Sequence, residues 1–178
     1  ISRSTTAPDG GSLNSIELDV ETEDKKFGIV QFIEAKNCHD IIGETVSVSF
    51  KAKVSNTRLA DVRVGVIAWS STADAVTSDI INAWENASTN PTLASNLTFE
   101  NTPASLSLTT SFATYKVEGI SIDTSSTTNV AVFIWSQTET NDVADKLYIT
   151  DVQLEKGNVA GNYDRKSYNQ EWSDCQRY

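Results

Sequence analysis

The chain has 178 residues, a length that suits one domain with a sizeable core and needs no disulfide or metal to hold it together. Its 24 acidic residues outnumber its 14 lysines and arginines and give a formal charge of −10, which excludes functions that need a basic surface, such as nucleic-acid binding. No apolar run approaches the length of a membrane span, so we expect no membrane insertion.

The first third of the chain predicts three strands. Residues 1–12 are expected to be a flexible lead-in, and residues 13–20 and 27–35 are expected to be strands. Residues 36–42 should connect them to the next strand. In residues 45–55, apolar side chains at every even position from 46 to 54 alternate with serines and lysines, which predicts one face in the core and one in water.

Two later strands have a second face that is amphipathic rather than polar. In residues 61–70, valines and an alanine alternate with a face that carries Arg63 and Trp69. In residues 129–137 the corresponding face carries Trp135. Further strands are expected at residues 106–109, 115–122 and 146–154.

A long excursion, residues 71–105, interrupts the strands and is rich in Ser, Thr, Asn and Ala. Within it, residues 79–84 have the spacing of a short amphipathic helix, capped by Thr77 or Ser78. The excursion is too long for an ordinary hairpin, and such segments usually carry function or contact a partner. Together, these patterns predict an all-β sandwich with one short helix in a long inter-strand excursion.

No catalytic set stands out in the sequence, and we expect no enzyme activity. His39 is the sole histidine, and Cys38-His39-Asp40 is expected to be a turn, because neighbours along an extended chain point to opposite faces. No flanking pattern selects a pair of acids for glycoside hydrolysis. Cys38 and Cys175 are the only cysteines, and we expect two free thiols, as in a protein assembled in a reducing cytoplasm.

The end of the chain carries the most specific signal. Its residues are Val152-Gln153-Leu154-Glu155 with Gly157, then Ala160, Tyr163-Asp164, Lys166, Tyr168, Glu171 and Cys175-Gln176-Arg177-Tyr178. This pattern resembles the ending of a large group of bacteriophage virion proteins, which are tail-fibre-like or head-decoration-like and carry a jelly roll similar to a carbohydrate-binding module. Residues 43–53 and 129–135 also resemble that group.

The resemblance implies a virion-surface protein assembled in the host cytoplasm. Residues 1–160 would form the jelly-roll β-sandwich, and residues 161–178 would form an arm that packs on the sandwich or on a neighbouring subunit. Such proteins usually form trimers, so a homotrimer is expected. The partners would be other virion proteins or a host surface glycan. A carbohydrate-binding module of a secreted bacterial glycoside hydrolase is the alternative. The residues expected at a subunit contact are Tyr163, Tyr168, Trp172, Arg177 and Tyr178.

Exposed aromatic rings beside amides and carboxylates would suit a glycan, because sugars present apolar C–H faces. Trp69, Trp135 and Trp84 could line one rim with Gln137, together with Asp79 and Asn82. The other interpretation is that these tryptophans pack the excursion onto the sheet, since large aromatic residues are mostly buried. The sequence leaves both interpretations open.

No cofactor is required by the sequence, but a structural calcium ion is a second hypothesis. Alternation places Asp151 on the same strand face as Leu147 and Ile149. The resemblance implies that calcium can be held at Asp151, with help from Glu17 or Asp19. Without the resemblance, Asp151 would pair with a backbone amide or a lysine, because an unpaired buried carboxylate is costly.

Overall fold

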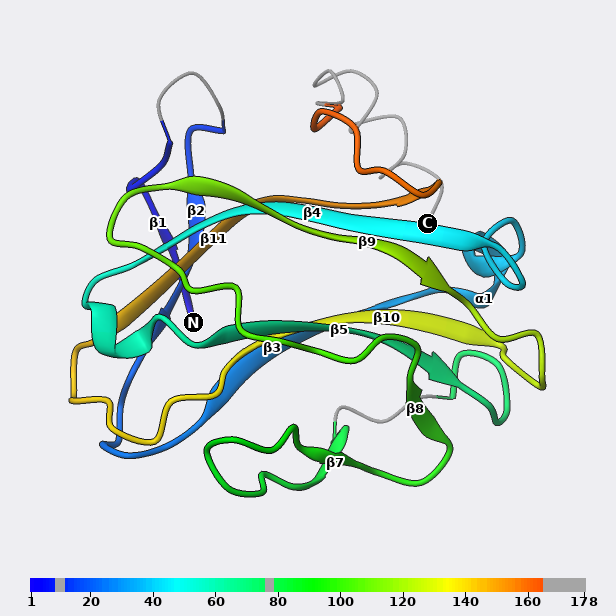
Figure 1. The fold of residues 1–178 in the computed structure, drawn as a ribbon, viewed down its shortest axis with the longest axis horizontal. Coiled ribbons are helices and arrows are strands. Elements are labelled where there is room, and N and C mark those ends of the chain that lie inside the picture. Colours follow the sequence, from blue (N-terminus) through cyan, green and yellow to red (C-terminus); the bar gives the residue numbers. More distant parts are fainter. Residues whose placement is uncertain (9–11, 76–78, 165–178) are drawn as a thin grey trace.

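The structure is a computed structural model, and it describes residues 1–8, 12–75 and 79–164. Two antiparallel sheets face each other (Figure 1). Sheet A contains, in spatial order, β1 (Ser2–Ser4), β2 (Ser15–Asp19), β11 (Lys146–Lys156), β4 (Thr45–Val54) and β9 (Ala113–Ser121). Sheet B contains β3 (Phe27–Ile33), β10 (Asn129–Ser136), β5 (Val62–Trp69) and β8 (Leu97–Phe99). The remaining elements are the ribbon of β6 (Ile81–Ala83) and β7 (Thr92–Leu93), the helix α1 (Ala35–Cys38) and the 3₁₀ turn η1 (Thr57–Leu59).

The strand order is that of a jelly roll. From β2 to β5 the chain crosses from one sheet to the other at every connection, and it does so again from β8 to β11. The returning strands insert between the earlier ones, so β11 lies between β2 and β4 while β10 lies between β3 and β5. This interleaving of two Greek keys defines the jelly roll, and the all-β prediction is confirmed.

The main core lies between the two sheets. The even-numbered residues of β4, from Val46 to Val54, point into it, as their alternation predicted. The small apolar face of β5 and the Val130, Val132 and Ile134 face of β10 meet them from sheet B. Strands with this pattern bury one face fully because side chains alternate across a pleated strand.

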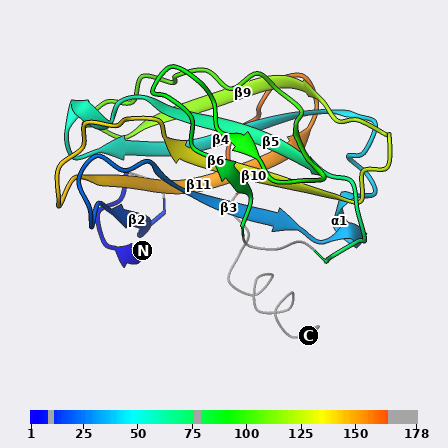
Figure 2. The ribbon, with the colours of Figure 1, turned by 90° about the horizontal axis from the view of Figure 1, so that it is seen from below.

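A second core lies on the outside of sheet B, under the described part of the excursion. Ile67 of β5 and Phe133 and Trp135 of β10 pack there against Ile80 and Leu97 of the excursion. Figure 2, seen from below, shows β6 in front of β5 and β10. The second face of these two strands is therefore apolar because a third layer covers it.

The helix expected at residues 79–84 was wrong, since this segment forms β6 and pairs with β7. The carbonyl of Ile80 accepts a hydrogen bond from the amide of Ala94 at 2.9 Å, and Ile80 itself is buried. Burial against sheet B and pairing with a neighbouring strand satisfy this backbone, whereas an isolated helix this short is marginal. The short α-helix of the described chain is α1, where a connection was expected.

Two smaller expectations also differ from the structure. The lead-in residues Ser2–Ser4 form β1 and pair with β2. Residues 106–109 are not a strand, although the amides of Leu106 and Leu108 donate to Val62 and Ala60 near the start of β5. The strand that pairs with β5 on this side is β8, inside the excursion. No helix within the described ranges has the length and hydrophobicity to span a bilayer.

Candidate functional site

The tryptophan rim expected from the sequence is not an exposed surface. Trp135 has 0% exposure, and its ring stacks on Phe133 with a centroid distance of 4.6 Å. Its indole Nε1 donates to the Oε1 of Gln137, which is also fully buried. The amide of Gln137 in turn donates to the carbonyls of Asn86 and Thr89 in the excursion. The structure therefore places Trp135 and Gln137 in the second core, where they hold the excursion onto sheet B.

The remaining residues of the expected rim do not form an exposed aromatic surface either. Trp69 and Trp84 are half-buried against the second core. The indole Nε1 of Trp69 donates to the carbonyl of Thr72 at 2.9 Å. Asp79 and Asn82 are exposed. The structure thus favours the interpretation in which the tryptophans pack the excursion, because covering a sheet face removes its aromatic rings from water.

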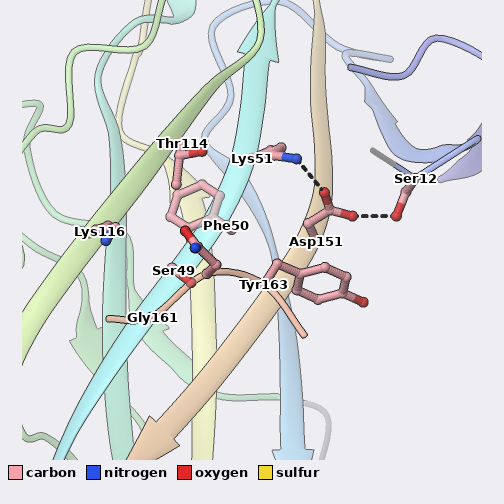
Figure 3. Close-up of a pocket in the computed structure, with 10 residues that line it drawn as sticks. Ser12, Ser49, Phe50, Lys51, Thr114, Lys116, Asp151, Gly161 and Tyr163 are labelled. Atoms are coloured by element: carbon pink, nitrogen blue, oxygen red, sulfur yellow. Dashed lines mark hydrogen bonds and ion pairs between the residues drawn. The ribbon is translucent and has the colours of Figure 1, made fainter. Parts of the chain in front are cut away.

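An open groove lies instead on the outer face of sheet A (Figure 3). It has two adjoining parts, with volumes of about 270 Å³ and about 500 Å³, that share Lys51 and Thr114. The first part is lined by Ser12, Ser49, Phe50, Lys51, Thr114, Lys116, Asp151, Gly161, Asn162 and Tyr163. The second adds Ala7, Pro8, Lys53, Thr110, Ser111, Phe112 and Ala113. We call the two parts together the sheet A groove.

A β-bulge in β11 turns Asp151 into this groove. The pairing between β11 and β4 shifts register between Thr150 and Gln153, and Asp151 has a φ of 52°. An extra residue in a strand redirects side chains beyond it. Asp151 therefore does not share the inward face of Leu147 and Ile149, as strict alternation predicted. It is held instead by Lys51 on the neighbouring strand, at 2.9 Å, and by the hydroxyl of Ser12 (Figure 3).

The surroundings of Asp151 stabilise its charged form. Burial raises its pKa, but the hydrogen bonds from Ser12 and Lys51 and the charge of Lys51 lower it by more, so the pKa lies below the usual aspartate range. A carboxylate with a lower pKa in the folded chain stabilises the fold above the unfolded value of roughly 3.9. That contribution is lost as the pH falls through the folded value.

We therefore expect Asp151→Asn to flatten the acid limb of the stability profile. The wild type should lose more unfolding free energy than the variant between about pH 5 and pH 2, because only the wild type has this carboxylate to protonate. Urea unfolding at a series of pH values measures the difference. Asp40→Asn, at an exposed position, is the control for the loss of one negative charge. Identical profiles for the wild type and Asp151→Asn would contradict this assignment.

A strap, residues 157–164, runs from the end of β11 back over sheet A. The Ala160 amide donates to Glu118 Oε1, and the Ala160 carbonyl accepts from Lys116 Nζ at 2.6 Å. The amide of Asp164 donates to the side chain of Gln153. These bonds cover one end of the sheet face and bring the Tyr163 ring, with 40% exposure, to the wall of the groove (Figure 3).

Two further aromatic rings lie at the other end of the face. The ammonium of Lys53 is 5.5 Å from the ring centroid of Phe112 and 5.0 Å from that of Tyr148. Both distances are within the range of cation–π attraction. Sequence reasoning placed Lys51 and Lys53 on a solvated face but did not find this site, because the groove depends on which strands are neighbours.

The acids proposed for calcium do not form one site. Glu17 accepts from Lys146 at 2.5 Å, and Asp19 lies 4.0 Å from the same ammonium. Asp151 pairs separately with Lys51. Across residues 1–8, 12–75 and 79–164, no group of three or more acid, histidine or cysteine side chains could hold a metal ion. Calcium needs several oxygen ligands, whereas each of these three carboxylates has a lysine ammonium as its partner here.

The Cys38-His39 pair is split between core and solvent. Cys38 is buried as a free thiol, and its sulfur accepts a hydrogen bond from the Val130 amide at 3.2 Å. Burial raises the pKa of this thiol. His39 follows it at an exposed position. The remaining sequence-based candidates Tyr168, Trp172, Arg177 and Tyr178, together with Cys175, lie outside the described residues.

No protein-family model and no curated protein matches the chain. Among solved structures it is similar to one described as "CBM4 structure and function", with 14% identity over 85% of this chain and 74% of that chain and a TM-score of 0.48. It is also similar to the enzymatically active domain of bacteriophage CBA120 tailspike protein 4, with 13% identity over 88% of this chain and 17% of that one and a TM-score of 0.46. A third is TmCBM61 in complex with beta-1,4-galactotriose, with 10% identity, coverages of 83% and 74% and a TM-score of 0.40. Likenesses this distant say nothing of function. The strand order of the chain itself identifies the jelly roll.

Proposed function

We propose that the chain is a non-enzymatic attachment module that binds glycans in the sheet A groove. The observation that carries this proposal is the groove itself, in which the exposed ring of Tyr163 adjoins hydroxyl and ammonium groups. An aromatic ring packs on the apolar face of a sugar, and the polar groups bond its hydroxyls. The tryptophan face is not part of the proposal, because the excursion covers it.

The setting we propose is the surface of a bacteriophage virion, as a tail-fibre, receptor-binding or head-decoration module. The support is the resemblance of the C-terminal residues to such proteins. The module would assemble as a homotrimer and attach the particle to a host glycan or to other virion proteins. A carbohydrate-binding module of a secreted glycoside hydrolase would use the same groove. Localisation of the chain on an intact particle favours the first setting, and a catalytic domain in the same gene product favours the second.

The proposed binding site predicts that Tyr163→Ala weakens glycan binding about tenfold, because the ring loses both its contact area and its stacking on the sugar. Binding is measured first on a glycan array and then by calorimetric titration of the best ligand. The free energy of unfolding should change by less than about 0.5 kcal/mol, as is usual for an exposed side chain.

Val159→Ala is the matched control for this variant. Val159 lies in the same strap with 70% exposure and does not line the groove. Unchanged affinity in Tyr163→Ala would remove the groove as the site. Failure of the wild type to bind any glycan of the array would remove the proposed function.

A further inference from the structure

We infer that the sheet A groove selects acidic glycans, with the ammoniums of Lys53 and Lys116 as the groups that meet sugar carboxylates. This inference rests on the proposed function and adds the chemical class of the ligand. It follows from the charges that line the groove, from the rings beside them and from the spacing of the two lysines along the sheet.

The groove is locally positive in a chain with a formal charge of −10. Its lining contains three lysines, Lys51, Lys53 and Lys116, and a single acid, Asp151. The side chain of Asp151 is only 2% exposed and is occupied by Lys51 and Ser12. The carboxylate is thus covered by its own partners inside the groove, and the charged lining groups that remain accessible are ammoniums.

Lys53 carries a charge without a counter-ion. No acid in the described part of the chain forms an ion pair with it, and its ammonium lies over the rings of Phe112 and Tyr148. Ring faces hold the ammonium in place without neutralising it, and its three donors can still bond an anion. A sugar stacked beside these rings would bring a carboxylate on its ring carbon to the ammonium.

Lys116 is held mainly by a neutral partner. Its Nζ donates to the carbonyl of Ala160 at 2.6 Å, whereas Glu118 Oε1 lies at 4.0 Å and accepts from the Ala160 amide. The side chain is 41% exposed and lines the groove. Two of its three donors therefore remain for a ligand.

The spacing of the two lysines along the sheet fits an oligosaccharide. Lys116 pairs with Ser49 in the register of β4 and β9, and Lys53 lies four residues further along β4. Four residues of strand span roughly 13 Å, at about 3.3 Å per residue. A ligand that contacts both lysines at this backbone separation is longer than one sugar unit, and we expect it to carry more than one carboxylate.

A nucleic acid could contact the same lysines, but it would also meet the rest of a negatively charged surface. Phosphate polyanions bind through many cations at once, and a chain of charge −10 repels them over a Debye length of about 8 Å at physiological salt. Direct contacts inside the groove are screened less than this repulsion. A short carboxylated glycan therefore fits the charge distribution better than a nucleic acid does.

The test uses a panel of uronate-containing and sialate-terminated oligosaccharides, each printed beside its methyl ester, which keeps the sugar and removes the charge. The wild-type chain should bind at least one acid form about tenfold more tightly than its ester, since a hydrogen bond to a charged group is worth about one decade or more. Calorimetry on that pair then compares the variants at about 0.15 M salt. A duplex DNA oligomer serves as the non-glycan polyanion.

Lys53→Gln and Lys116→Gln should each weaken binding of the acid form about tenfold more than binding of the ester, because both lysines also line the groove that holds the uncharged sugar. Lys36→Gln removes the same charge at an exposed position on α1 and should leave both affinities unchanged. Equal binding of acids and esters, or an equal loss in Lys36→Gln, would overturn the acidic preference while the glycan-binding function stands. Equally tight binding of the DNA would also overturn it. Binding of neither acids, esters nor neutral glycans would instead remove the proposed function.

Discussion

Trp135→Ala is expected to lower the free energy of unfolding by about 3–5 kcal/mol, the usual cost of removing a large buried ring. Trp135 is fully buried and stacks between Phe133, at 4.6 Å, and Phe99, at 5.8 Å. Its removal also leaves the buried side chain of Gln137 without the indole donor. The excursion should therefore loosen from sheet B before the sandwich itself unfolds.

Urea unfolding monitored by the remaining tryptophans measures this loss. Trp69→Ala is the comparison, because Trp69 is only half-buried and should cost less. At temperatures where the variant is still folded, glycan binding should persist, since the sheet A groove lies on the other side of the sandwich. Loss of binding with stability almost unchanged would return the glycan site to the tryptophan face.

Gly65→Ala should destabilise the chain by about 1–3 kcal/mol, the typical cost of forcing extra atoms into a packed core. A Cβ atom at Gly65 would lie 2.4 Å from Cε1 and 2.6 Å from Cδ1 of Phe99. The Phe99 ring covers Gly65 and stacks on Trp135, so it has little room to move. The missing side chain of Gly65 is thus what lets β8 and the excursion lie close to β5.

A double-mutant cycle tests this explanation. Gly65→Ala combined with Phe99→Ala should cost less than the sum of the two single changes, by about 1 kcal/mol, because the collision disappears with the ring. The four free energies of unfolding are measured under identical conditions. Strict additivity would mean that the cost of Gly65→Ala arises elsewhere.

The residues of the site show how far sequence reasoning reached. Lys51 and Lys53 were placed correctly on the outward face of β4, since alternation alone decides that. Their meeting with Asp151, Phe112 and Tyr148 could not be foreseen, because it depends on β4 lying between β9 and β11. The bulge at Asp151 was also not predicted from the sequence, since a single extra residue leaves the local pattern of polar and apolar side chains almost unchanged.

The sequence by itself determined that the protein is a β-sandwich. Apolar residues at every second position give a strand an apolar face, and two sheets of such strands bury these faces by packing against each other. It also marked the second faces of β5 and β10 as unusual through Trp69 and Trp135. Only the tertiary structure decided that Ile81–Ala83, within the expected helix, form a strand over those faces, and that the open groove lies on sheet A. The physical reason is that burial, strand pairing and register are set by contacts between residues far apart in the chain, whereas periodicity reports only on neighbours.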